Sequence, residues 1–325
     1  MALVGWLRRL TINLSAQDVC VLAYFSYQLV LLLRLDDSPD ARAARPPLLA
    51  LTALALLTVT LVRGDLVPAG RVRALLYRLC MVFSVVGCYL AMRPYLMARR
   101  APLLDERLLR LDLQLFGQTP AVAWERFATP AVVEWFAFFY FSYYALHVLN
   151  VLGSALFDEG ERMAELLFAA MAVACIGYIG YTLVPGIGPY ATLSFAQPLR
   201  GYYFFGLVQG TVAAAGAQLD IFPSLHTAFP SLFALHALRH RGCAPFRYLW
   251  PLSVLFAVNI VIATMFLRWH YAIDVVVGFT LAVAAHRTAI AVVRREASRE
   301  RRGRQPVFEV LWPPRGPAAA APPAA

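Results

Sequence analysis

The sequence predicts an all-α polytopic membrane protein with about eight transmembrane helices. Two features of its composition point this way: 60% of the 325 residues are hydrophobic and only 15% are charged. A soluble chain normally carries about 25% charged residues. The third observation is that the apolar residues gather in long runs. A spanning helix needs roughly 20 mainly apolar residues, or fewer when charged side chains at its ends reach the interface. An ordinary soluble domain is therefore excluded.

Eight apolar runs are long enough to be candidate spans, and the first two are the shortest. Arg8 and Arg9 precede the first run, but no small-residue cleavage site follows it, so we expect a retained helix rather than a signal peptide. We do not find an internal repeat. The candidates cover about 19–34, 48–62, 75–96, 131–157, 163–184, 223–238, 248–267 and 271–292.

The charges indicate a membrane topology rather than a nucleic-acid partner. The formal net charge is +10, and all 29 basic residues are arginine. Most of them flank apolar runs, and an excess of arginine marks cytoplasmic loops. With eight spans, this rule places both termini in the cytoplasm. The five cysteines are scattered without zinc-site spacing, so they indicate neither a metal cluster nor a disulfide framework.

Two segments outside the spans carry their own expectations. The loop 97–130 contains several arginines although it falls on the outer side, but it also holds acidic residues and leucines at helical spacing. We interpret the part near 103–127 as an amphipathic helix lying in the membrane interface. The tail 299–325 is rich in Arg, Pro and Ala, which cannot bury a core, so we expect a disordered cytoplasmic tail.

Three unusual stretches reach the same outer face in this topology: "LVPGIGPY" (183–190), "FPSLH" (222–226) and "RWHYAID" (268–274). His270 and Asp274 are four residues apart, so they share a helix face. A carboxylate that holds one imidazole nitrogen fixes the tautomer and makes the other nitrogen a better nucleophile or base. Three segments that converge on one membrane surface predict a functional site there.

The remaining polar residues of these stretches suit phosphoryl transfer. His226 lies at a helix start, where backbone N–H groups favour an anion. Ser224 adds a hydroxyl donor and Arg268 a fixed positive charge. One histidine can attack phosphorus while a second protonates the leaving oxygen, and the donors stabilise the transferred group.

The same motifs carry a family resemblance. "PSLH" with "RWHYAIDVVVG" resembles the second and third motifs of the type-2 phosphatidic acid phosphatase superfamily. The wider pattern, including "LVPGIGPY" and "LDLQLFGQTP", more closely resembles the inositol phosphorylceramide synthase branch and its bacterial relatives. The resemblance covers roughly residues 75–292. It implies a six-helix catalytic membrane core over 75–298, with helices 1–74 outside it and the tail 299–325 beyond.

The resemblance also implies the roles of the site residues. His270 would be the nucleophile that becomes phosphohistidine, Asp274 its orienting partner and His226 the general acid, with no metal or other cofactor. The superfamily's first motif requires a lysine, which this chain lacks; Arg93-Pro94 is a remnant at best. Ala263-Thr264 replace the Ser-Arg of the third motif. The motifs therefore do not decide which residues bind the phosphate. The candidates are Ser224, Arg268, Arg200, Gly186 and Gly188.

The sequence thus predicts a lipid phosphotransferase or phosphatase in the plasma membrane of a bacterium, with its site on the extracytoplasmic face. The substrate would be a phospholipid or lipid phosphate, and the acceptor a lipid, a sugar or water. The branch resemblance favours head-group transfer; a polyprenyl or lipid (pyro)phosphate phosphatase is the alternative. A haem protein with His226 and His270 as axial ligands, or a non-catalytic transporter, remains a hypothesis of another class. The sequence leaves the oligomeric state open.

Overall fold

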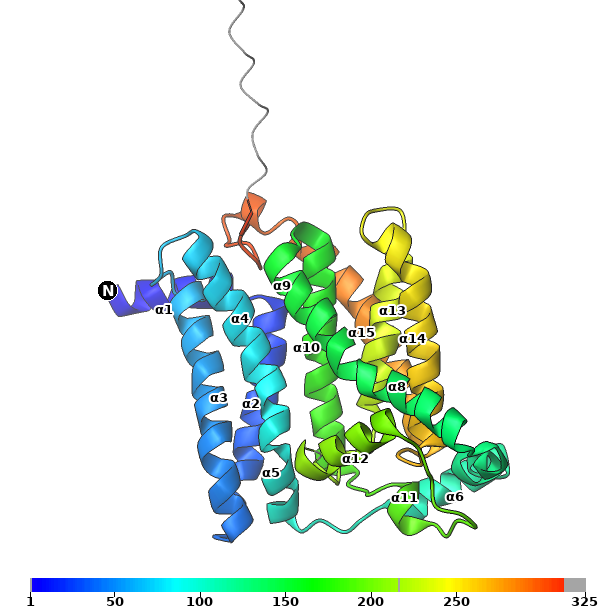
Figure 1. Ribbon diagram of the computed structural model, residues 1–325. Coiled ribbons are helices and arrows are strands. Elements are labelled where there is room, and N and C mark those ends of the chain that lie inside the picture. Colours follow the sequence, from blue (N-terminus) through cyan, green and yellow to red (C-terminus); the bar gives the residue numbers. More distant parts are fainter. Residues whose placement is uncertain (1, 216, 313–325) are drawn as a thin grey trace, which may run out of the picture.

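The computed structural model describes residues 2–215 and 217–312, which form a bundle of helices packed side by side (Figure 1). An isolated parallel β-bridge joins Gly186 to Asp220. The predicted all-α fold of a polytopic membrane protein is confirmed. The α-helices are α1 (Ala2–Asn13), α2 (Ala16–Leu32), α3 (Pro39–Arg63), α4 (Arg71–Gly87), α5 (Met92–Arg99), α6 (Asp105–Phe116), α7 (Pro120–Ala123), α8 (Pro130–His147), α9 (Gly153–Phe157), α10 (Gly160–Leu183), α11 (Pro189–Thr192), α12 (Tyr203–Ala215), α13 (Leu225–Arg239), α14 (Phe246–Phe266) and α15 (Ala272–Glu296).

Each of the eight predicted spans falls on a helix, but not every one is long enough to cross a bilayer by itself. Among the described residues, six segments are long and apolar enough, or seven if the bent pair α1–α2 counts as one span. The predicted span 223–238 is not among these segments because α13 has only 15 residues and extends over about 22 Å, less than a hydrocarbon core of about 30 Å, although it runs from one end of the bundle toward the other. The six are α3, α4–α5 with the turn η1 (Cys88–Ala91), α8–α9 with the π-helical turn η3 (Val148–Leu152), α10, α14 and α15.

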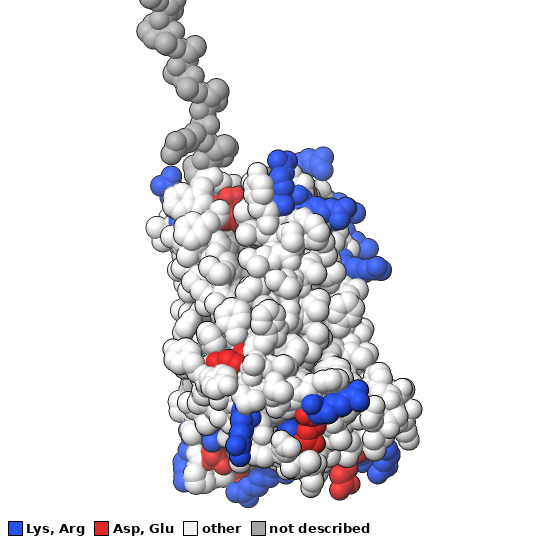
Figure 2. All heavy atoms as spheres, turned by 45° about the vertical axis from the view of Figure 1, so that its right-hand side comes forward, with Lys and Arg blue, Asp and Glu red and all other residues white. Residues whose placement is uncertain are grey.

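Charged side chains gather toward the two ends of the bundle. Figure 2 shows arginines and acidic residues there, with a mostly uncharged band of surface between them. The helix α10 runs through the middle of the bundle and packs against α2, α13 and α15. Most of α10 is buried, as expected for a central helix that is apolar on most of its sides. The protein is therefore an integral membrane protein.

The two ends of the bundle carry different parts of the chain. Figure 1 shows α1 and the last described residues at one end, and α6 and α11 at the other. The helix α6 is the amphipathic segment expected near 103–127, and it lies across its end of the bundle rather than through it. This is also the end to which the "PGIG" loop and the start of α15 belong, because α6 contacts both.

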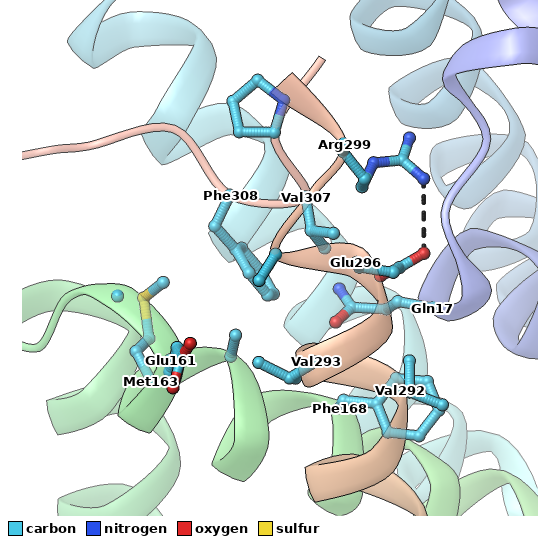
Figure 3. A pocket seen from close by; sticks show the side chains of 14 residues that line it. Gln17, Glu161, Met163, Phe168, Val292, Val293, Glu296, Arg299, Val307 and Phe308 are labelled. Carbon is cyan, nitrogen blue, oxygen red and sulfur yellow. Dashed lines mark hydrogen bonds and ion pairs between the residues drawn. The ribbon is translucent and has the colours of Figure 1, made fainter. Parts of the chain in front are cut away.

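The segment after α15 differs from the disordered tail expected from Arg299. Residues 299–312 fold back over the bundle end. Arg63 donates to the carbonyls of Pro306 and Val307, both at 3.0 Å, and Phe308 packs against Tyr77. Figure 3 shows Phe308 and Val307 beside a cavity of about 200 Å³ between this segment, α10 and α15. Buried arginines need acceptors, and the backbone of this segment supplies them. Residues 313–325 lie outside the described residues.

A close helix crossing fixes the position of the "PSLH" segment. Gly278 on α15 faces the start of α13, and a Cβ at this position would lie 2.4 Å from the backbone oxygen of Ser224. The Ser224 N–H in turn donates to the carbonyl of Asp274 at 3.1 Å. The absence of a side chain at Gly278 therefore brings the starts of α13 and α15 together.

Gly278→Ala is expected to destabilise the protein by about 1–3 kcal/mol, because the added methyl group overpacks this crossing. Thermal unfolding measures the effect. Gly153→Ala is the matched control: Gly153 is helical and a Cβ there meets nothing within 4 Å. Equal effects of the two substitutions would contradict the argument.

Candidate active site

A cavity of about 50 Å³ lies beside the starts of α13 and α15 and brings the two predicted histidines together. The ring centroids of His226 and His270 are 6.4 Å apart. A phosphoryl group between two such rings can reach both of them. The lining residues are Tyr89, Tyr140, Tyr144, Ile187, Tyr190, Val212, Gln218, Asp220, Ile221, His226, Trp269 and His270.

The local sequence around α15 sets the pairing of His270 with Asp274. Tyr271 is the N-cap of α15, and its backbone N–H donates to Oδ2 of Asp274 at 3.0 Å. The same oxygen lies 3.5 Å from Nδ1 of His270. Both side chains are buried. The carboxylate is therefore held where it faces one imidazole nitrogen, and the ring borders the cavity.

The orientation of His226 is set by aromatic rings of α8. His226 lies in the first turn of α13, and its ring stacks on Tyr140 at 4.4 Å with an interplanar angle of 9°. Tyr143 packs against the same ring at 4.1 Å. These tyrosines belong to the run "EWFAFFYFSYY", in which packing residues and cavity residues look alike, so the sequence did not single them out.

Ser224 lies directly before α13 but is not among the cavity-lining residues. It is fully buried, and in the described part of the chain its hydroxyl has no hydrogen-bond partner. The N-cap position with extended backbone accounts for its place in the chain.

The glycines of "PGIG" are placed by packing. The backbone N–H groups of Ile187 and Gly188 donate to the carboxylate of Asp105, at 3.0 Å and 2.8 Å. Gly188 has φ +101°, and a Cβ there would lie 2.3 Å from the carbonyl oxygen of Trp269. A Cβ at Gly186 would lie 2.7 Å from Cδ1 of the Ile221 side chain. Asp105 thus occupies the amides that a phosphate would need in this loop.

The candidate arginines do not line the cavity. Arg268 has φ +69° and its guanidinium bonds Glu125 at 3.2 Å and the carbonyl of Gln197 at 3.0 Å. It also lies 3.7 Å over the ring of Phe195. Arg200 is exposed in the loop before α12. The structure therefore places Arg268 as a tie between loops.

A second carboxylate of α6 holds the start of α15. Asp112 is fully buried and accepts the backbone N–H groups of Ala272 and Ile273, both at 2.9 Å. Thr119 donates to it as well. Asp105 and Asp112 together tie α6 to two of the segments that border the cavity. Neither residue was predicted from the sequence.

Asp220 is a further cavity residue that the sequence analysis missed. It precedes Ser224 by four residues, its carboxylate accepts a hydrogen bond from the Tyr89 hydroxyl at 2.9 Å, and it faces the same cavity as His270. Burial raises the pKa of Asp220, against the opposing influence of the hydrogen bond from Tyr89. A lone acidic residue next to the "PSLH" motif was the signal available.

Asp220→Asn is expected to flatten the pH dependence of stability. A raised pKa means that the carboxyl group loses its proton less readily in the folded state than in the unfolded state. Ionisation of this group therefore destabilises the fold. Wild-type stability should therefore fall as the pH rises from the ordinary value of an aspartate through the raised pKa, and the asparagine variant should lack that component. Thermal unfolding in detergent across this range measures it. A parallel pH dependence in both proteins would contradict it.

Fold and site together define a polytopic membrane protein with two histidines and a carboxylate around a cavity at one end of the bundle. A sequence model of the PAP2 superfamily matches residues 106–288, more than half of the chain. The protein therefore belongs to the PAP2 superfamily, which comprises phosphatases and phosphotransferases of lipid phosphates. No curated protein matches the chain, and no solved structure matches it.

Proposed function

We propose that this protein is a membrane lipid phosphotransferase that acts through a phosphohistidine on His270. The observation that carries the proposal is the arrangement of His226 and His270, 6.4 Å apart on one cavity, with Asp274 behind His270. The membrane location and the superfamily support a lipid phosphate as donor. A preorganised pair of histidines supplies the nucleophile and the acid that such a reaction needs.

In the first step His270 Nε2 forms a bond to phosphorus while the bond from phosphorus to the leaving oxygen breaks. His226, in its imidazolium form, gives its proton to that oxygen. Asp274 faces Nδ1, keeps the proton there, and stabilises the positive charge that develops on the ring. In the second step an acceptor hydroxyl attacks the phosphohistidine, His226 takes the proton of that hydroxyl, and the N–P bond breaks.

The nature of the acceptor decides between transfer and hydrolysis. We favour transfer to a hydroxyl of a lipid or sugar head group, of the inositol phosphorylceramide synthase type. The motif resemblance supports it. So does the small cavity, because its walls include four tyrosines and Trp269, and Asp220 and Gln218 can bond a hydroxyl acceptor. Water as the acceptor would make the protein a lipid phosphatase.

Helix α13 offers the most direct stabilisation for the transferred phosphoryl group. Its N-terminal backbone amides favour an anion, and the unpartnered hydroxyl of Ser224 lies at its cap. We keep Arg268, Arg200, Gly186 and Gly188 as weaker candidates, because the first is bonded to Glu125 and the "PGIG" amides to Asp105. A charged substrate would have to displace those contacts.

We further propose that turnover requires no divalent metal, since histidines and helix amides supply the charge. Chelation by EDTA should leave the turnover per folded molecule unchanged, with the folded fraction checked by thermal unfolding. Loss of turnover in folded protein that magnesium or zinc restores would refute this part. By the same proposal, residues 75–298 are the catalytic unit and helices 1–74 lie outside it.

The site is proposed to face away from the cytoplasm in a bacterial plasma membrane, with both termini inside. Arginine-rich loops at the end that carries α1 and the tail support it. Cys243, the exposed cysteine of the α13–α14 loop, is a built-in probe. A membrane-impermeant maleimide should label Cys243 after the cells are permeabilised but not before. Labelling in intact cells would reverse the orientation.

The decisive experiment supplies purified protein in lipid nanodiscs with a phospholipid labelled on phosphorus, with and without hydroxyl acceptors. Label in a new lipid identifies transfer, and release of a phosphomonoester or inorganic phosphate identifies hydrolysis. Loss of every product in His270→Ala, but not in Gly153→Ala, ties the reaction to the cavity. No labelled product from any lipid phosphate would overturn the proposed function.

A further inference from the structure

A second group of ionisable side chains lies at the other end of the bundle from the cavity. Glu165 on α10 and His236 and His240 on α13 each offer one ligand-type atom, and these atoms lie within 4.8 Å of one another. The two histidines are four residues apart and share a helix face. Figure 1 places the end of α13 and the start of α10 at the end of the bundle that carries α1.

His236 is the member that the surrounding protein does not explain. Its side chain is fully buried, and within the described residues neither ring nitrogen has a hydrogen-bond partner. Its ring lies 4.6 Å from that of His240 and meets Phe246 edge-on at 5.2 Å. A buried polar group without a partner is costly. A ligand that accepts a ring-nitrogen lone pair would remove that cost.

The other two members are already at ligand spacing. Nε2 of His240 lies 3.0 Å from Oε2 of Glu165. Ligand atoms at bonds of about 2.0–2.1 Å around a tetrahedral zinc ion are about 3.3 Å apart. A small movement of His236 would therefore complete three corners of a tetrahedron.

We propose that Glu165, His236 and His240 bind one divalent transition-metal ion, with water in the fourth position. Two imidazoles and a carboxylate form a donor set that suits Zn²⁺. Because the ligands come from α10 and α13, the bound ion links the central helix of the bundle to the helix that carries His226. The ion stabilises the fold and takes no part in the chemistry at the cavity.

Arg239 is the competitor for this site. Its Nε and Nη2 donate to the two oxygens of Glu165, at 2.8 Å and 2.9 Å, so it neutralises the carboxylate in the metal-free protein. A carboxylate has lone pairs left for a metal beside an arginine. The positive charge of Arg239 nevertheless opposes a cation, and Arg239→Gln is expected to tighten metal binding.

The experiment uses the full-length protein without a histidine tag, stripped of metal, in detergent. Titration with Co²⁺ should give the visible absorption of tetrahedral coordination, saturating at one equivalent, and Zn²⁺ should displace it. Even outer-shell partners contribute about 10–100-fold to metal affinity, so His236→Gln and His240→Gln should each weaken binding by about a hundredfold or more. Zn²⁺ should raise the unfolding temperature of the wild type and not that of these variants.

Two matched variants guard against other binding sites. His147→Gln removes another buried histidine outside the cluster, and Cys243→Ser removes an exposed thiol on the adjoining loop; both should keep the Co²⁺ spectrum. If His236→Gln fails to fold, His240→Gln still decides, because its side chain is 19% exposed. The absence of a Co²⁺ spectrum in the wild type, or its loss in Cys243→Ser with retention in both histidine variants, would overturn the proposal.

Discussion

His270→Ala is expected to reduce turnover by at least about ten-thousandfold, since loss of a nucleophile removes the covalent step itself. Brief incubation of the wild type with phosphorus-labelled substrate, followed by denaturation, should trap an acid-labile phosphohistidine. The variant should trap none. His147→Ala provides the control, because His147 on α8 also has buried ring nitrogens but does not line the cavity. Full activity in His270→Ala would remove the catalytic interpretation.

His226→Ala separates the two histidines. If His226 is the acid, its loss slows substrates with poor leaving groups most, because a good leaving group needs little protonation. With a good leaving group, label should accumulate on His270, since the second step then lacks its base. Label on His226 in the wild type would reverse the two roles.

Asp274→Asn is expected to cost about ten-thousandfold in turnover while the protein stays folded, as in comparable triads in which the histidine loses its orienting charge. An asparagine can still accept the Tyr271 N–H that Asp274 accepts at 3.0 Å, so the start of α15 is preserved. Steady-state kinetics together with thermal unfolding measures the two effects separately.

Asp112→Asn is the matched control for that substitution. Asp112 also caps the first turn of α15, through Ala272 and Ile273, but the carboxylate that pairs with His270 is that of Asp274. It should lower stability more than turnover. A comparable loss of turnover in both variants would mean that Asp274 acts through helix capping and not through the histidine.

Local pattern was enough to predict most helices and the central residues of the site. Each of the eight apolar runs falls on a helix, because a bilayer demands an apolar surface whatever the tertiary fold. The spacing of His270 and Asp274 predicted their pairing, since four residues make one helical turn. Their approach to His226 relied on topology and motif resemblance, and the structure brings the three together.

The features that the sequence did not predict are contacts between residues distant in sequence. Asp105 and Asp112 looked like charges on the polar side of an amphipathic helix, yet both are buried against backbone amides. No local pattern tells a carboxylate that caps a distant loop from one that faces water. The prediction of disorder for residues 299–312 failed for a related reason. This segment is held by distant buried side chains such as Arg63, which donates to the carbonyls of Pro306 and Val307.

Helix α6 also acts as a spacer. Asp105 and Asp112 are nearly two helical turns apart, about 10 Å along the axis. Asp105 accepts a hydrogen bond from the "PGIG" loop, and Asp112 accepts one from the start of α15. The distance between these two segments is thereby tied to the length of one rigid element. One residue inserted between the two carboxylates would turn Asp112 by about 100° away from α15.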